Sequence, residues 1–201
     1  MVGTIEPRKG HLQVLAAFEL LWQRGVQANL VIVGNEGWRP LPENARRTIP
    51  EIVRRLESHP QRGQRLFWLK GIDDTYLQAL YQRCDCLLAA SEGEGFGLPL
   101  IEAAHASLPL IARDLPVFRE VAGTHAHYFS GLEPAALADA VQQWLALDAA
   151  GDAPPSAGMP WMTWRDNAQR LLGVLGLQQA GATHDGGSAA QRSWPSPSSA
   201  S

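Results

Sequence analysis

Two glutamates frame the stretch of this sequence whose residue types point most directly to chemistry. Glu94 and Glu102 enclose Gly-Phe-Gly-Leu-Pro-Leu-Ile, and a short apolar run at residues 84–90 precedes them. The run predicts a buried strand, the glycines a tight loop, and Pro99 the first turn of a helix. Free amides at residues 96–98 and the helix dipole would favour an anion, while the carboxylates would accept hydrogen bonds from hydroxyls. The stretch therefore predicts a site for a phosphorylated sugar.

Two other interpretations of this glycine loop remain open. It could be a plain turn between a strand and a helix, with both glutamates solvated. It could also be a dinucleotide-binding loop, but after Gly93 and Gly95 the third glycine, Gly97, comes one residue too early for G-x-G-x-x-G. In that motif Asp114, about twenty residues further on, would be the acid that binds the ribose.

Two cations follow the first apolar segment of the chain, residues 2–5. In an open α/β sheet, Arg8 and Lys9 would lie at the carboxyl ends of the strands, the same edge as the glycine loop. Lysine and arginine beside a helix N-terminus suit a pyrophosphate, and arginine can bind two oxygens at once. Ser91 either hydrogen-bonds a phosphate or caps the end of its strand. The alternative for Arg8 and Lys9 is a solvated charge pair before a helix.

The stretch from Glu94 to Glu102 resembles the retaining glycosyltransferases of family GT4, which have the GT-B fold. Two glutamates with seven residues between them, around a Gly-Phe-Gly-Leu-Pro core, are typical of that family. The resemblance extends to residues 2–10, 30–34, 77–90 and 108–123. It implies that the chain is the C-terminal, donor-binding half of a GT-B enzyme.

The resemblance also implies a role for each residue of the motif. Lys9 and Arg8 would hold a pyrophosphate, Glu94 would accept from sugar hydroxyls, and Glu102 would accept from the ribose diol. The remaining binding residues would be Gly95, Phe96, Gly97 and Leu98 around the phosphates, with Gly71, Ile72 and Leu77 near the nucleobase. For these last three, simple hydrophobic packing is the alternative. The family uses neither a metal nor a cofactor.

The implied reaction is transfer of a hexose from a nucleoside diphosphate-sugar with retention, in bacterial polysaccharide or lipopolysaccharide synthesis. The Glu-Pro-Arg-Lys form of the first loop resembles a subgroup of mannosyl- and rhamnosyltransferases, so GDP-mannose is the expected donor. The family's acceptor-binding half precedes this domain, whereas here Met1 directly adjoins the first strand. We therefore expect a fragment, a truncated product or one subunit of a split enzyme, inactive alone. The rival is a non-catalytic module that binds nucleotide-sugars.

Composition narrows the function classes. A formal net charge of −3 offers no general attraction to nucleic acid or to an anionic membrane. No apolar run reaches the 18 or so residues of a membrane span, so a cytoplasmic location is the default, with at most peripheral membrane contact through the missing half. Cys84 and Cys86 lack the companion ligands of a zinc site, and we expect buried free thiols.

Strands and helices alternate along the chain. Short apolar runs predict strands at residues 2–5, 30–33, 66–69, 84–90, 108–112 and 127–129. Helical periodicity and start signals predict helices at residues 11–24, 45–57, 74–83, 116–121, 134–147 and 164–175. This order predicts an α/β fold, a Rossmann-like parallel sheet with helices on both faces. Residues 148–160 resemble a linker, and we assign 1–177 to the donor-binding domain and 178–201 to a disordered tail.

Overall fold

The computed structural model describes residues 1–161 and 164–177 of the chain. The chain divides into two compact units, Met1–Trp161 and Met162–Ser201. The boundary between them lies inside the range 1–177 that the sequence analysis assigned to one domain. The tail expected at residues 178–201 lies outside the described residues.

The first unit contains five short strands, and all the pairings between them are parallel. β1 (Leu30–Val33) pairs with β2 (Leu66–Leu69), and β4 (Leu110–Arg113) lies between β3 (Leu87–Ala89) and β5 (His127–Phe129). The predicted strands at 30–33, 66–69 and 127–129 are confirmed residue for residue. β3 is shorter than predicted, because Cys84 and Cys86 lie before it rather than in it. Both are free thiols as expected, but they are half-buried rather than buried.

The predicted strand at residues 2–5 is wrong as a continuous strand. Val2 and Ile5 form only isolated parallel bridges, to Val33 and Glu36. The segment still runs beside β1: the amide of Gly3 donates to the carbonyl of Val33 at 2.9 Å. Its apolar residues therefore lie where a strand was expected, without the full ladder of hydrogen bonds.

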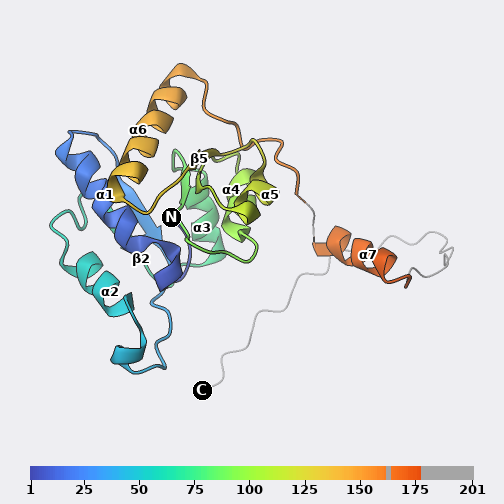
Figure 1. Ribbon diagram of the computed structural model, residues 1–201, viewed down its shortest axis with the longest axis horizontal. Coiled ribbons are helices and arrows are strands. Elements are labelled where there is room, and N and C mark those ends of the chain that lie inside the picture. Colours follow the sequence, from blue (N-terminus) through green and yellow to red (C-terminus); the bar gives the residue numbers. More distant parts are fainter. Residues whose placement is uncertain (162–163, 178–201) are drawn as a thin grey trace. The chain divides into compact units, whose positions relative to one another are not determined.

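Helices connect these strands, as expected for parallel pairs. Their bounds are α1 His11–Gln23, α2 Ile49–Ser58, α3 Asp74–Tyr81, α4 Leu98–His105, α5 Pro116–Ala122 and α6 Pro134–Ala150, with single 3₁₀ turns η1 Pro7–Lys9 and η2 Glu43–Ala45 (Figure 1). Proline occupies the first turn of α2, α4, α5 and α6, where its missing N–H costs no hydrogen bond. α3 is capped by Asp73, whose carboxylate accepts from the amide of Tyr76.

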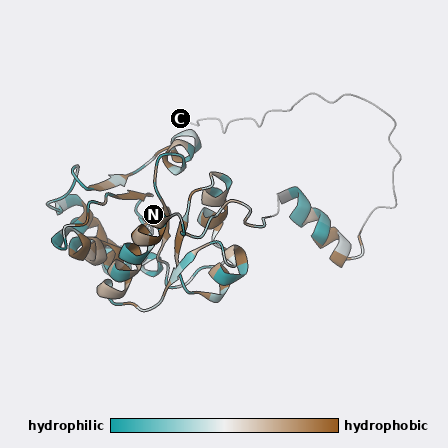
Figure 2. Cartoon of the chain, turned by 90° about the horizontal axis from the view of Figure 1, so that it is seen from above, coloured by the Kyte–Doolittle hydropathy of each residue, from teal (hydrophilic) through white to brown (hydrophobic). Residues whose placement is uncertain are grey.

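Alternate residues of the strands face two separate hydrophobic clusters. Leu88 and Ile111 pack into a cluster with residues of α1, α2 and α6, and α1 lies against α6. Leu87 and Leu110 pack into a second cluster with residues of α3, α4 and α5. Because neighbouring residues of a strand point to opposite faces, helices must cover both faces of the sheet. The predicted Rossmann-like α/β fold is confirmed, and its helices carry both apolar and polar residues (Figure 2).

The predicted linker at residues 148–160 is wrong in part. α6 continues to Ala150, and the segment after it packs back onto the second cluster. Met159 is 3% exposed and Ser156 is 1% exposed. The Ala, Gly and Pro content of the segment suggested a linker. Composition alone could not show that Met159 within it is buried. In the second unit, α7 (Trp164–Val174) confirms the predicted helix, and Leu171, Leu172 and Val174 on it are exposed.

Gly10 allows the turn that carries Arg8 and Lys9 to approach the end of β3. It caps η1 with a left-handed φ of 75°, and a Cβ built there would lie 2.3 Å from the carbonyl oxygen of Ala90. The backbone of Glu92 donates to the carbonyl of Arg8 at 2.7 Å, so the two segments are joined directly. Only glycine fits at this position.

We predict that Gly10→Ala destabilises the chain far more than Gly25→Ala does. Gly25 has a similar φ of 80° but nothing within 4 Å of its added Cβ. The conformational strain, about 1–2 kcal/mol, is common to both, and the clash with Ala90 adds about 1–3 kcal/mol only at position 10. Urea unfolding of the two variants measures this difference. Equal losses would show that the close approach does not constrain the fold.

Candidate functional site

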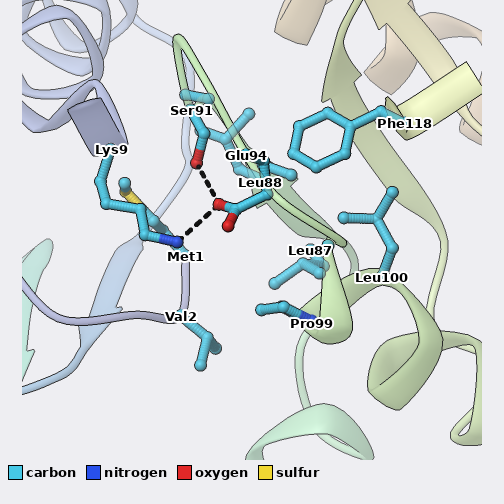
Figure 3. Close-up of a pocket in the computed structure, with 13 residues that line it drawn as sticks. Met1, Val2, Lys9, Leu87, Leu88, Ser91, Glu94, Pro99, Leu100 and Phe118 are labelled. Atoms are coloured by element: carbon cyan, nitrogen blue, oxygen red, sulfur yellow. Dashed lines mark hydrogen bonds and ion pairs between the residues drawn. The ribbon is translucent and has the colours of Figure 1, made fainter. Parts of the chain in front are cut away.

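A pocket of about 320 Å³, part of it open to solvent, lies at the carboxyl end of β3. It is lined by residues from both stretches singled out in the sequence, including Lys9, Ser91, Glu94 and Pro99 (Figure 3). The parallel sheet explains the meeting, because the loops that follow neighbouring strands emerge at one edge. Residues 85 positions apart are thus brought into contact by the fold.

The cations of the first loop pair with Glu94. The Lys9 ammonium lies 2.6 Å from one carboxylate oxygen of Glu94, and an Arg8 nitrogen lies 3.1 Å from the other. The Ser91 hydroxyl donates to the same oxygen as Lys9, at 3.2 Å (Figure 3). Arg8 also pairs with Glu6 at 3.1 Å. The carboxylate expected to bind the sugar therefore forms ion pairs with the two cations expected to bind phosphate.

Glu94 remains ionised in this arrangement. Burial alone would raise the pKa of its carboxyl, but hydrogen bonds from Lys9 and Arg8 outweigh burial, so its pKa lies below the ordinary value. The side chains of Lys9 and Glu94 are only 12% and 13% exposed. Their attraction is therefore less screened than that of a surface ion pair.

The amino end of α4 leaves donors free beside this pocket. Among the hydrogen bonds of the described residues, the amides of Phe96, Gly97 and Leu98 have no acceptor. Gly97 caps the helix with φ 85°, and its added Cβ would lie 3.0 Å from the Phe118 ring. Gly93 and Gly95 have no positive φ and no neighbour within 4 Å of an added Cβ. Of the three glycines, only Gly97 is required by its conformation.

Glu102 lies one turn into α4 and is held by a tyrosine that the sequence analysis did not assign. The Tyr81 hydroxyl, from α3, donates to a carboxylate oxygen of Glu102 at 2.9 Å. Burial, with the charge of Glu102 second, raises the pKa of Tyr81, so this hydroxyl stays protonated as a donor. One carboxylate oxygen of Glu102 is fixed in place, while the other accepts no hydrogen bond from the described residues.

The residues expected near a nucleobase are only partly placed for that role. The Gly71 amide is already used: it donates to the side-chain oxygen of Asn35 at 3.0 Å. Leu77 packs with Tyr81 on the second hydrophobic cluster, which is the packing alternative left open for it. Gly71 is exposed and Ile72 is half-buried, so both can still present backbone groups to a ligand.

Asp114, the residue that would bind the ribose in the dinucleotide alternative, is already paired with another side chain. Asp114 forms a two-point ion pair with Arg119, at 2.8 and 2.9 Å, on the exposed start of α5.

Within residues 1–161 and 164–177, no group of three or more His, Cys, Asp or Glu side chains is placed to hold a metal ion. In the same part of the chain, no helix is long and apolar enough to cross a membrane.

Sequence reasoning missed three polar residues that hold loops near the pocket, of which Arg113 and Gln13 are buried and Asn35 is exposed. Arg113, Gln13 and Asn35 hold the strand ends and loops in place, yet each lies within or beside an apolar run. The one available signal was an arginine directly after the apolar residues 108–112, where the predicted strand was ended one residue too early.

Comparisons with known proteins identify the family of the chain. The family described as "Glycosyl transferases group 1" matches residues 1–153. The serotype-specific mannosyltransferase WbdA of Escherichia coli is 51% identical over 172 residues, which are 86% of this chain and 20% of WbdA. The O-antigen chain mannosyltransferase B of E. coli is 29% identical over 126 residues, 61% of this chain and 30% of that protein. The chain thus spans about a fifth of the length of the first relatives it matches.

A solved structure shows the same fold. The C-terminal domain of a glycosyl transferase group 1 family protein, LpcC from Francisella tularensis, superposes with a TM-score of 0.58 at 18% identity. The match covers 76% of this chain and 77% of that domain, so the similarity extends over most of both.

Proposed function

The chain belongs to the group 1 glycosyl transferases, and from that membership we propose that it binds the nucleoside diphosphate-sugar donor of a retaining hexosyltransferase. The observation that carries this proposal is the meeting of Lys9, Ser91 and Glu94 in one pocket, with Arg8 paired to Glu94 beside it and the free amides of α4 nearby. Two cations and a helix N-terminus suit a diphosphate, and a carboxylate suits sugar hydroxyls.

Donor binding must rearrange the ion pairs of this pocket. As the diphosphate approaches, Lys9 and Arg8 turn from Glu94 towards the phosphate oxygens, and the released carboxylate accepts from the sugar hydroxyls. Ser91, which donates to Glu94 at 3.2 Å, can keep that carboxylate in place meanwhile. The same cations then stabilise the negative charge that develops on the departing nucleoside diphosphate as the bond between the anomeric carbon and the phosphate oxygen breaks.

Mannose is the sugar we propose. The relative with 51% identity is a mannosyltransferase, and another relative is an O-antigen chain mannosyltransferase. We therefore propose GDP-mannose as the donor and a surface polysaccharide as the acceptor. Glu102 would accept from the ribose diol with the carboxylate oxygen that Tyr81 leaves open.

Transfer requires more than this donor site. Retaining catalysis needs an acceptor hydroxyl held against the anomeric carbon, and we assign no described residue to that task. We propose that the acceptor side is supplied by another part of a longer enzyme, so that the 201-residue chain alone binds donor without transferring sugar. The rival function is a nucleotide-sugar-binding module with no catalytic partner.

A calorimetric screen of the chain against GDP-mannose, UDP-glucose and dTDP-rhamnose tests donor binding. We expect saturable binding of GDP-mannose, competition by GDP, and much weaker binding of guanosine, because the phosphates supply much of the affinity. Absence of binding to all three sugar nucleotides would contradict the proposal. A second experiment adds an acceptor-binding domain and measures the transfer of labelled mannose. Transfer is expected if the chain is part of an enzyme, and no transfer is expected if it is a non-catalytic binding module.

A further inference from the structure

Arg113 is a buried arginine at the carboxyl end of β4, the central strand of the three-stranded sheet. The other three residues of this strand are apolar, and Arg113 itself is only 5% exposed. A guanidinium keeps its charge in proteins, so burying it is costly unless its donors find acceptors. The contacts of Arg113 therefore show what holds the charge in this position.

The guanidinium binds the backbone where the glycine loop leaves β3. Its Nε lies 3.0 Å from the carbonyl oxygen of Ser91, and Nη2 lies 3.0 Å from that of Ala90. Nη1 lies 2.5 Å from the carbonyl oxygen of Gly131, and Nη2 also donates to the side-chain oxygen of Gln13 on α1. One side chain thus joins the end of β3, the first helix and the loop after β5.

These contacts fix both halves of the pocket. Ser91 is the residue whose hydroxyl donates to Glu94, so holding its backbone also sets the position of that carboxylate. The Ala90 carbonyl is the atom against which Gly10 packs, and Gly10 directly follows Lys9. An arginine fork matches two neighbouring carbonyls, which a lysine ammonium cannot do with the same geometry.

Arg113 adds a positive charge behind the pocket: it does not line the pocket but binds the backbone of the lining residues Ala90 and Ser91. Arg8 and Lys9 are paired with Glu6 and Glu94, so the four visible charges cancel. In the part of the chain that the structure describes, no carboxylate oxygen lies within ion-pair distance of Arg113. Burial lowers the pKa of Arg113 and the more distant Glu92 partly opposes this, but an arginine remains charged.

We propose that Arg113 is a positioning residue for the donor site, which orients the Ala90–Ser91 backbone through its fork and favours an anionic ligand through its unpaired charge. This inference rests on the proposed function. It separates two effects: the geometry of the loop should govern the preference for a sugar nucleotide over a bare nucleotide, and the charge should govern the affinity for both.

Two substitutions separate these effects, and the surface offers a matched control for each. Arg113→Lys keeps the charge but not the fork. Gln13→Glu keeps the arginine and places a carboxylate beside Nη2, while removing the donor that Gln13 offers to the carbonyls of Gly131 and Glu133. Arg24 donates to Gln142 in the same way on the exposed side of α1 and α6, so Arg24→Lys and Gln142→Glu are the controls. All variants are made in the 201-residue chain, and thermal unfolding identifies a temperature at which each is folded.

Calorimetry with GDP-mannose and GDP gives the result. We expect Arg113→Lys to remove most of the preference for GDP-mannose while changing the affinity for GDP less than about threefold. We expect Gln13→Glu to weaken both ligands by the same factor, about three- to tenfold. The controls should match the wild-type chain.

Each outcome decides a claim. A purely structural arginine would lower the unfolding temperature and leave both affinities unchanged, which would overturn the inference. If Arg113→Lys does not fold, Gln13→Glu still decides the effect of charge, and unchanged affinities there overturn it. If the wild-type chain binds neither ligand, the proposed function itself fails. If the wild-type chain binds and both variants bind as it does, only the role of Arg113 fails.

Discussion

Lys9→Ala is expected to weaken the binding of GDP and GDP-mannose alike, by about ten- to a hundredfold. A hydrogen bond to a charged group contributes about 1.5–3 kcal/mol, and about 1.4 kcal/mol corresponds to a tenfold change. The Lys9 side chain is only 12% exposed, so water screens its charge little. Its loss also leaves Glu94 without its 2.6 Å partner, and the freed negative charge would repel the diphosphate.

Titration calorimetry of the Lys9→Ala chain with each ligand measures this loss. Lys70→Ala is the matched control, because the Lys70 side chain is 44% exposed and pairs loosely with Glu57 at 3.4 Å. Both ligands should lose affinity by similar factors, since both contain the diphosphate. Unchanged GDP binding in Lys9→Ala would remove this lysine from the site.

Glu94→Gln is expected to tighten GDP binding and to remove the preference for GDP-mannose over GDP. Glu94 holds both Lys9 and Arg8 in ion pairs, so a neutral glutamine releases the cations and GDP should bind several-fold more tightly. GDP-mannose should bind no better than GDP, because the carboxylate that accepts from the sugar hydroxyls is gone. Each such charged hydrogen bond corresponds to about 1.5–3 kcal/mol.

Glu102→Gln provides the contrast, since its carboxylate would contact the ribose that both ligands share. We expect both ligands to lose affinity in that variant, with the preference for GDP-mannose preserved. Competition calorimetry with the two ligands distinguishes the patterns. Equal losses for both ligands in Glu94→Gln would show that this glutamate does not discriminate the sugar.

The sequence predicted much of the fold because periodicity reports burial. The apolar runs at β1 and β2 and the proline starts of α4 and α6 were predictable from local pattern. The bridges of residues 2–5 and the burial of Met159 were not, because they depend on how distant segments pack rather than on nearby residues.

The site was predictable to a lesser degree. That Lys9 and Glu94 would share one edge of the sheet followed from the parallel topology, and the structure places them in contact. Their mutual ion pair could not be predicted, because the spacing of residues in the sequence shows which side chains suit a ligand but not that these side chains pair with one another. The contacts of Arg113 and Tyr81 join residues far apart in sequence, and no local pattern encodes them.

A crystal structure of the 201-residue chain with bound GDP-mannose tests the central claim most directly. We predict that the two phosphates lie between Lys9 and the amides of residues 96–98, with mannose hydroxyls donating to a Glu94 released from Lys9. The ribose should lie against Glu102. A nucleotide bound elsewhere, with the 2.6 Å contact between Lys9 and Glu94 intact, would contradict the account.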